Sequence, residues 1–353
     1  MMSDNSFLLY GANGYTGELI ARYAAEYNLK PILAGRRKEA VEPIANKYNL
    51  PYLVFDLNDS NFLKDALQKV SLVVHAAGPF EFTAKPMIEA CLETQTHYID
   101  INGDIAVFEF LKKYDAHAKE KGVMIMPGVG FDVVPTDCLA LYLKKKLPDA
   151  KQLKIAFATI GGQISHGTAL TMAGRIGEGG AERREGKIVR VPLGNKGMWL
   201  IIENKKLFFM QIPWGDISTA YFTTGIPNIE TYTGITPKLY KILKFQKAFN
   251  WLLRTSVIRS FIKKQINKRE PGPSDEKREK AKAIVWAQVQ NTKGENATAY
   301  LTTPEGYTLT THSTLIIAKK ILEKKYLAGY QTPAIVYGAD LILEVPQVKR
   351  KII

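Results

Sequence analysis

The sequence predicts an α/β fold in which a doubly wound parallel sheet is joined to a second α+β domain on a mostly antiparallel sheet. Three observations predict it. Six short apolar runs alternate with stretches of helical periodicity over about the first 130 residues. A glycine-rich turn follows the first run. After Pro148, apolar runs follow one another with few helical stretches between them, which is typical of antiparallel strands.

The predicted strands of the first domain are short and almost wholly apolar, as expected for strands buried on both faces of a sheet. They cover Phe7–Tyr10, Ile32–Ala34, Tyr52–Phe55, Leu72–Ala76, His97–Asp100 and Val123–Met126. Helical spacing of apolar residues predicts helices at Gly14–Tyr27, Lys38–Tyr48, Phe62–Val70, Thr83–Glu93 and Ile105–Lys121. Helical connections between successive strands are what a parallel sheet requires.

In the second domain, the pattern predicts strands without helices between most of them. These strands cover Leu153–Ile160, Lys187–Pro192, Met198–Ile202, Ile217–Thr223, Ile284–Gln290 and Ala297–Thr303. A strongly apolar helix is predicted at Leu309–Leu327. We therefore expect a first domain over residues 1–136, a second over 137–330, and a carboxy-terminal segment over 331–353.

Composition limits the class of protein. The chain has 353 residues, of which 46% are apolar and 23% are charged, and this excludes global disorder. Two cysteines are too few for a disulfide scaffold or a four-cysteine zinc site, and suit a reducing compartment. With no signal peptide and no apolar run of about 18 residues, we expect a cytoplasmic protein that either stays in solution or associates peripherally with a membrane.

The net charge of +14 is concentrated in one segment. Between Lys238 and Arg269 there are ten basic residues and no acid. Apolar residues at helical spacing predict two basic amphipathic helices with a break near Thr255-Ser256, and Tyr240 falls outside the apolar face of the first. Two interpretations are open: the helices contact an anionic membrane or a lipid-like substrate, or they pack on the sheet. No nucleic-acid-binding motif accompanies the charge, so nucleic acid is not an expected partner.

The first strand-to-helix turn contains three glycines at the spacing G-x-x-G-x-x-G, namely Gly11, Gly14 and Gly17. Glycine permits the tight turn, the close approach of backbone to a pyrophosphate, and close packing of helix on strand. The helix N-terminus that follows offers unpaired N–H groups to phosphate. We interpret this turn as a dinucleotide site of the Rossmann type, the alternative being a purely structural turn.

The end of the second strand predicts which dinucleotide binds. Gly35 stands where a site selective for NAD carries an acid, and Arg36 and Arg37 follow it. Arginine binds phosphate in a bidentate manner, which favours NADP, unless both side chains are only solvated. The cofactor-binding residues that we predict are Gly11, Asn13, Gly14, Tyr15, Thr16, Gly17, Arg36, Arg37, Asp56, Leu57, Ala77, Gly78, Pro79 and Phe80.

An ordered set of motifs spans nearly the whole chain. In order, the motifs begin with the turn Tyr10–Gly17, Ala34-Gly-Arg36, Ala77-Gly-Pro-Phe80 and His97-Tyr-Ile-Asp100. They continue with Pro127–Asp137, Ser165-His-Gly-Thr168, Pro271-Gly-Pro-Ser274 and Gly306-Tyr-Thr308. This set resembles the saccharopine dehydrogenase-like oxidoreductases, a family that includes trans-acting enoyl reductases.

The resemblance implies an NADP-binding Rossmann domain, a second α+β domain, and a carboxy-terminal segment from Thr332 to Leu343 that returns toward the first domain. Some relatives act on lipid-linked substrates. The sequence departs from the family pattern at His166, where glycine is expected, and at Asp104, where glutamate is expected.

Three residues are candidates for proton transfer: Asp104 and Asp132, which follow predicted strands, and His166, which precedes a predicted helix. Each also suits a structural role, chiefly helix capping. Thr168, Trp214 and Asp216 are the predicted substrate contacts. The sequence has no HExxH or CxxC motif, so we expect no metal site.

Together these features predict hydride transfer, with NADP, to or from a hydrophobic and perhaps lipid-linked carbonyl or enoyl compound. Two alternatives are a saccharopine-type amino-acid dehydrogenase and a non-catalytic NADP-binding sensor or scaffold. A homodimer is compatible with the pattern.

Overall fold

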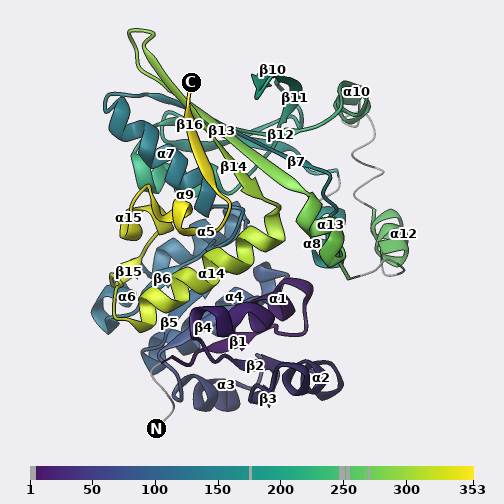
Figure 1. Cartoon of the computed structure of the whole chain (residues 1–353), viewed down its shortest axis with the longest axis vertical. Coiled ribbons are helices and arrows are strands. Elements are labelled where there is room, and N and C mark those ends of the chain that lie inside the picture. The colour runs from purple at the N-terminus through teal and green to yellow at the C-terminus, as the bar shows by residue number, and fades with distance from the viewer. Residues whose placement is uncertain (1–4, 175–176, 246–250, 252–254, 267, 269–270) are drawn as a thin grey trace. The chain divides into compact units, whose positions relative to one another are not determined.

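The computed structural model describes residues 5–174, 177–245, 251, 255–266, 268 and 271–353 (Figure 1). Three residues of the basic segment, Lys247, Arg254 and Arg269, lie outside the described residues. The chain forms two compact units, which we call the first domain (Met1–Val134 and Gly306–Pro346) and the second domain (Pro135–Glu305 and Gln347–Ile353).

This division differs from the predicted boundaries. The apolar helix α14 (Gly306–Leu322) was expected in the second domain, but it belongs to the first, where it packs against α1 (Tyr15–Tyr23) and β4 (Leu72–His75). Its apolar residues therefore help to cover the first sheet. The carboxy-terminal segment is also divided, because residues up to Pro346 belong to the first domain and the last strand joins the second sheet.

The first domain is built on a seven-stranded sheet in which every pairing is parallel, with strand order β15-β6-β5-β4-β1-β2-β3. All six predicted strands are present, and β15 adds a seventh that the sequence pattern did not predict. The strands are β1 (Leu8–Tyr10), β2 (Ile32–Gly35), β3 (Tyr52–Val54), β4, β5 (His97–Asp100), β6 (Met124–Met126) and β15 (Gly329–Tyr330). The predicted parallel sheet is confirmed.

Helices connect these strands, as the parallel topology requires. They are α1, η1 (Ala24–Tyr27), α2 (Lys38–Tyr48), α3 (Ser60–Leu67), α4 (Phe80–Thr94), α5 (Ile105–Leu111), η2 (Lys112–Tyr114), α6 (Asp115–Lys121), α14, α15 (Pro333–Tyr337) and η4 (Leu341–Glu344). The single helix predicted over Ile105–Lys121 is interrupted by the 3-10 turn η2. Strands β1, β4 and β6 are fully buried, so the core of this domain lies on both faces of its sheet.

The second domain is built on a nine-stranded sheet with strand order β10-β11-β12-β7-β13-β14-β16; in addition, β8 pairs with β12, and β9 pairs with β8. Its pairings are antiparallel except that of β12 with β7. The strands are β7 (Gln152–Ile160), β8 (Gly180–Arg184), β9 (Lys187–Val191), β10 (Gly197–Ile202), β11 (Lys205–Gln211), β12 (Asn228–Gly234), β13 (Lys282–Gln290), β14 (Asn296–Pro304) and β16 (Lys349–Ile352).

One predicted strand of this domain is wrong. Ile217–Thr223 lies within a helix, α9 (Asp216–Thr224), which has an acid in its first turn. Gly225 ends the helix in the left-handed conformation, at φ 66, and its N–H donates to the carbonyl oxygen of Tyr221. A glycine at this position is typical of the end of a helix, and the strand prediction did not take it into account. The other helices are α7 (Val134–Lys146), α8 (His166–Gly174), α10 (Pro237–Phe245), α12 (Ser256–Ile266) and α13 (Asp275–Lys280).

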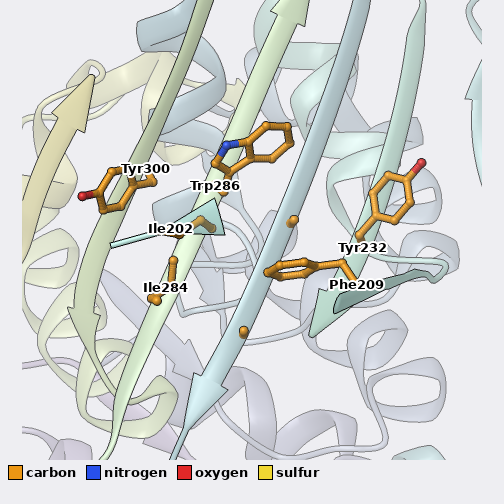
Figure 2. Packing of buried hydrophobic residues seen from close by; sticks show 8 residues of the cluster. Ile202, Phe209, Tyr232, Ile284, Trp286 and Tyr300 are labelled. Carbon is orange, nitrogen blue, oxygen red and sulfur yellow. The ribbon is translucent and has the colours of Figure 1, made fainter. Parts of the chain in front are cut away.

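Aromatic side chains form the core of the second sheet (Figure 2). Phe209, Tyr232 and Trp286 come from three different strands and are nearly inaccessible to solvent. Ile202 of the edge strand β10 belongs to the same cluster. Strand β10 therefore contributes one of its two faces to the core.

Candidate dinucleotide site and its surroundings

The glycine turn after β1 is packed too closely to hold side chains. Gly11 has φ +90, and a Cβ atom there would lie 2.7 Å from the backbone of Ala76 and Ala77. A Cβ atom on Gly17 would lie 2.2 Å from the carbonyl oxygen of Gly11. Gly14 precedes α1, and no side chain caps this helix end. Helix α1 thus starts without a side-chain cap, which is compatible with the phosphate-binding role that the glycine spacing predicts.

The end of β2 carries no acid. A Cβ atom on Gly35 would lie 2.8 Å from Oδ1 of Asn13 and 2.9 Å from Cγ2 of Val41, so a side chain at this position would displace its neighbours. Arg36 and Arg37 follow and are exposed. Arg37 lies 4.0 Å from Glu39, whereas Arg36 forms no ion pair within the described part of the chain. Arg36 is thus the better placed of the two to meet an anion.

The two other predicted cofactor segments are ordered by local hydrogen bonds. After β3, Oδ1 of Asp56 accepts from the backbone N–H and the side-chain amide of Asn58, at 2.9 and 2.7 Å, and Leu57 is buried. After β4, the hydroxyl of Thr83 donates to the carbonyl oxygen of Ala77 at 2.7 Å. Pro79 then leads into α4, which begins at Phe80. Asp56 is therefore engaged in closing its own turn.

His75 ends β4 and was not singled out by its sequence pattern. Its Nε2 lies 3.0 Å from Oγ1 of Thr83. Because the hydroxyl proton of Thr83 is directed to Ala77, we assign the ring proton of His75 to Nε2. Burial lowers the pKa of His75 to about 3, so the ring is neutral. Its Nδ1 is buried and has no hydrogen-bond partner among the described residues. His75 is not among the residues that the sequence pattern selects. Its position as the last residue of a wholly buried strand is the feature that could have identified it.

Asp100 ties together the loops that follow β5 and β6. Its carboxylate accepts from the hydroxyl of Tyr98 at 2.6 Å and from the backbone N–H groups of Asn102 and Gly128 at 3.0 and 2.8 Å. The side chain is fully buried. Burial raises the pKa of Asp100 to about 6, although these hydrogen bonds act to lower it.

The two predicted catalytic acids of this domain have different surroundings. Asp104 is the N-cap of α5, and its side chain accepts from the backbone N–H of Ala106 at 2.9 Å. Asp132 lies against Gly103, where a Cβ atom would come within 2.2 Å of Oδ2. Asp132 is only partly exposed, and its removal from water raises its pKa to about 7. Asp104 thus has a structural role, while Asp132 holds a proton near neutral pH.

Helix α14 fixes the loop that carries Asp132. Oγ1 of Thr310 accepts from the backbone N–H of Phe131 at 2.9 Å, and the hydroxyl of Ser313 donates to the carbonyl oxygen of Val129 at 2.7 Å. The sequence pattern did not predict these contacts, because it assigned α14 to the other domain.

The remaining predicted residues lie on two helices of the second domain. Ser165 precedes α8 and its Oγ accepts from the backbone N–H of Thr168 at 3.2 Å. His166, the first residue of α8, donates its backbone N–H to the carbonyl oxygen of Pro271 at 2.9 Å. This bond joins two motifs that are about a hundred residues apart in sequence.

The other two predicted substrate contacts lie about fifty residues further along the chain. Trp214 precedes α9 by two residues, and Asp216 is the first residue of that helix. The ring centroid of Trp214 is 4.4 Å from that of Phe157 in β7, and Asp216 is fully buried. His166 and Thr168 thus lie in α8, whereas Asp216 is the first residue of α9 and Trp214 precedes that helix.

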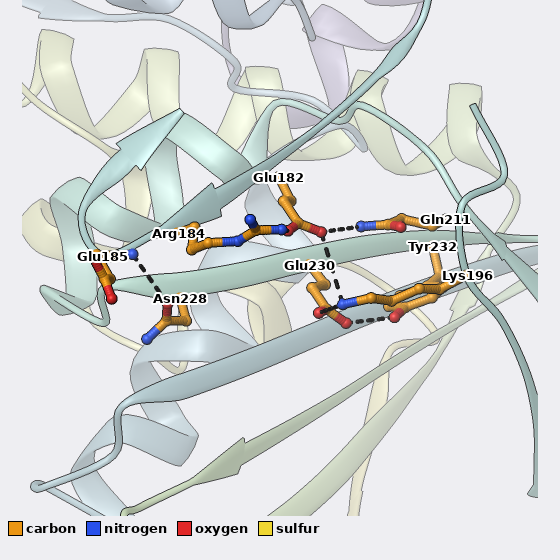
Figure 3. Close-up of polar contacts among 8 residues, drawn as sticks. All are labelled: Glu182, Arg184, Glu185, Lys196, Gln211, Asn228, Glu230 and Tyr232. Atoms are coloured by element: carbon orange, nitrogen blue, oxygen red, sulfur yellow. Dashed lines mark hydrogen bonds and ion pairs between the residues drawn. The ribbon is translucent and has the colours of Figure 1, made fainter. Parts of the chain in front are cut away.

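A second polar cluster surrounds Glu182 of β8 (Figure 3). Its carboxylate accepts from the side-chain amide of Gln211 at 2.7 Å and pairs with Arg184, and Nζ of Lys196 lies 3.8 Å away. Burial by itself raises the pKa of Glu182, but these hydrogen bonds and charges lower it overall. Lys196 also pairs with Glu230 of β12.

Comparison with known proteins identifies the first domain. Residues 7–126 match the family model for the saccharopine dehydrogenase NADP binding domain. These residues, about a third of the chain, are similar to that domain. The resemblance predicted from the motifs is thereby confirmed for the segment that holds the glycine turn, Arg36 and Asp100.

Curated relatives agree with this assignment. A bovine (Bos taurus) saccharopine dehydrogenase-like oxidoreductase is 30% identical over 173 residues, which are 43% of this chain and 40% of the relative. A trans-acting enoyl reductase from Mycobacterium leprae is 29% identical over 150 residues, which are 40% of this chain and 35% of the relative. A lipid droplet localized protein from Caenorhabditis elegans is 29% identical over 158 residues, which are 41% of this chain and 37% of the relative. The chain thus spans well under half of the length of each.

The fold extends the likeness to the whole chain. The apo structure of saccharopine dehydrogenase (L-Glu forming) from Saccharomyces cerevisiae superposes with a TM-score of 0.70, and covers 99% of this chain and 100% of the yeast chain at 12% identity. This comparison confirms the predicted fold class, a parallel sheet with a second domain on a mixed sheet.

Proposed function

We propose that this protein is an NADP-dependent oxidoreductase that transfers a hydride to or from a hydrophobic carbonyl or enoyl substrate. The observation that carries the proposal is the turn at Gly11–Gly17, where Gly11 and Gly17 admit no side chains and the start of α1 has no side-chain cap. When bound there, the cofactor supplies or accepts the hydride.

The end of β2 supports NADP over NAD. Asn13 fills the space beside Gly35, so no acid is available to bind a ribose 2′-hydroxyl. Arg36 is exposed and unpaired among the described residues, and a guanidinium group binds phosphate through two parallel hydrogen bonds. Arg36 is therefore the residue that we assign to the 2′-phosphate.

Asp132 is the residue that we assign to proton transfer. Reduction of a carbonyl or enoyl group needs a proton as well as a hydride, and a group with a pKa close to the working pH exchanges protons most effectively. Asp132 has a pKa of about 7 and follows β6 at the carboxyl edge of the sheet, where ligands bind in folds of this type. His166 remains an alternative. The carboxylate of Asp100 positions the loop that leads to Asp132 by holding Gly128.

The class of substrate is inferred from relatives and from surface chemistry. One relative is named a trans-acting enoyl reductase and another a lipid droplet localized protein. The second domain also exposes several large apolar side chains. A saccharopine-type amino-acid dehydrogenase is the second candidate, since the fold matches the yeast enzyme over 99% of this chain. NADP-dependent oxidation of saccharopine with release of glutamate, but no turnover of enoyl or carbonyl lipids, would favour it.

The cofactor assignment is tested by Arg36→Glu. We expect its affinity for NADPH to fall about a hundredfold, because a favourable charge-assisted hydrogen bond is replaced by repulsion, while affinity for NADH changes little. Isothermal titration calorimetry measures both. Lys30→Glu, which makes the same charge change before the opposite end of β2, is the matched control. Equal losses of NADPH and NADH affinity would contradict the 2′-phosphate assignment.

A further inference from the structure

Two elements of the second domain expose large apolar side chains to solvent. On β10, Trp199 is 51% exposed and Ile201 is 71% exposed, while the alternating residue Ile202 is buried in the core. On α10, Leu239 is 44% exposed and Ile242 is 59% exposed. Strand β10 is therefore apolar on both faces, although only one of them is covered. We call these four side chains and the lysines around them the apolar–basic face.

Ring contacts connect the two elements into one surface. The ring centroid of Trp199 lies 5.1 Å from that of Phe208 in β11, and the ring of Phe208 lies 4.9 Å from that of Tyr240 in α10. This chain of contacts runs from the edge strand to the helix without a break. Trp199 and Leu239 thus belong to neighbouring parts of one face rather than to scattered sites.

The apolar side chains are surrounded by lysines. Nζ of Lys206 lies 5.0 Å from the centre of the Trp199 ring, and Nζ of Lys244 lies 5.7 Å from the centre of the Tyr240 ring. Lys238 and Lys241 are exposed on the same helix. Glu203, in the turn between β10 and β11, is neutralised by Lys351 at 2.8 Å.

The packing of α10 is the reverse of what its periodicity predicts for a helix that covers a sheet. Tyr240, which falls outside the predicted apolar face, makes the contact with β11. Leu239 and Ile242, which belong to the predicted apolar face, remain exposed. In the described part of α10, a contact with the sheet is therefore made by Tyr240, while Leu239 and Ile242 are exposed.

We propose that the apolar–basic face binds the surface of an anionic phospholipid membrane. Tryptophan and isoleucine side chains enter the boundary between headgroups and acyl chains, and lysines meet the lipid phosphates. No helix among the described residues is long and apolar enough to cross a membrane, so binding through this face is peripheral. The proposal does not depend on which substrate or cofactor the protein uses.

Two other partners fit the face less well. A second copy of the chain would bring lysines against lysines if the same face were shared, and this costs electrostatic energy. Nucleic acid would use the lysines, but the aliphatic side chains of Ile201 and Ile242 have no counterpart on a phosphate backbone. An anionic membrane uses both the charge and the apolar area.

Vesicle sedimentation tests the proposal. Vesicles of phosphatidylcholine with phosphatidylserine should bind the protein, and vesicles of phosphatidylcholine alone should bind it much more weakly. The double variant Ile201→Ser, Ile242→Ser should lose at least tenfold in the partition coefficient, because its apolar contribution is removed. Each of Lys206→Gln and Lys241→Gln should lose about fivefold, and added salt should have the same effect.

Matched controls separate this result from misfolding and from a failure of the proposed function. Leu327→Ser removes a side chain that is 51% exposed and lies in a loop after α14, so it should leave vesicle binding unchanged. All variants should bind NADPH as the unaltered protein does. Binding that ignores phosphatidylserine, or that survives both the serine and the glutamine substitutions, overturns the proposal. So does a preference for RNA over vesicles, or for self-association through this face.

Discussion

Two regions of the molecule, the strand ends of the first domain and the apolar–basic face of the second, depart in opposite directions from the rule that apolar groups are buried and polar groups exposed. The first domain buries His75, Asp100 and Asn102 at or beyond the ends of its strands. The second domain leaves Trp199 and Ile201 in solvent. Buried polar groups and exposed apolar groups are the informative exceptions, since each lowers stability unless something compensates for it. For Asp100 three hydrogen bonds compensate, and for the exposed apolar side chains of the second domain we infer that a membrane surface does.

The largest effect is expected at Asp100. Asp100→Ala removes the acceptor for Tyr98, Asn102 and Gly128, and leaves buried donors unpaired. We expect the free energy of unfolding to fall by about 3–5 kcal/mol, measured by urea denaturation. Asp104→Ala, which removes only an exposed helix cap in the same region, should cost about 1 kcal/mol. Similar losses of free energy of unfolding in both variants would mean that the buried hydrogen bonds of Asp100 contribute no more to stability than the helix cap of Asp104.

The pH dependence of stability should distinguish Asp100 from Glu182. The folded pKa of Asp100 is raised to about 6 from an ordinary value of 3.8, so this group stabilises the fold at low pH and loses that contribution as pH rises. The free energy of unfolding of the unaltered protein, measured relative to that of Asp100→Asn, should therefore fall by about 3 kcal/mol between pH 4 and pH 7.

Glu182 should show the opposite sign. Its folded pKa is lowered, so its contribution is present at neutral pH and is lost as pH falls through that lowered pKa. Denaturation of Glu182→Gln and Asp100→Asn across pH, each against the unaltered protein, measures the two slopes. Slopes of the same sign would show that the two carboxylates have similar surroundings after all.

The same contrast explains how much of the molecule its sequence predicts. In the first domain most strands are buried on both faces, so apolar runs located all six predicted strands to within a residue or two at each end. The glycine turn was also predictable, because its close backbone contacts permit no other residue at Gly11 and Gly17. Long-range contacts could not be predicted in this way. Nothing near Asp132 in the sequence indicates that Thr310 holds the loop that contains Asp132.

In the second domain, periodicity was a weaker guide. The β-branched and aromatic residues of α9 are typical of a strand, and the helix was decided by Gly225 and by tertiary packing. Strands β8, β11 and β12 were missed, because polar residues such as Glu182, Gln211 and Glu230 interrupt their apolar pattern. Gln211 donates to Glu182, and Lys196 lies close to both Glu182 and Glu230; the pattern of a single strand cannot reveal such contacts.

The smallest effects on the free energy of unfolding are expected for substitutions in α10. These effects show whether the apolar face of the helix is exposed to solvent. Tyr240→Ala should lower the free energy of unfolding by about 2 kcal/mol, because the ring packs on Phe208 and is only half-buried. Ile242→Ala should change it by less than about 0.5 kcal/mol, since the side chain has little buried area to lose and alanine favours helix. Urea denaturation of both variants gives the comparison. If Ile242→Ala proves as costly as Tyr240→Ala, Ile242 packs against the protein in solution, and the surface that we assign to a membrane is already occupied by the chain itself.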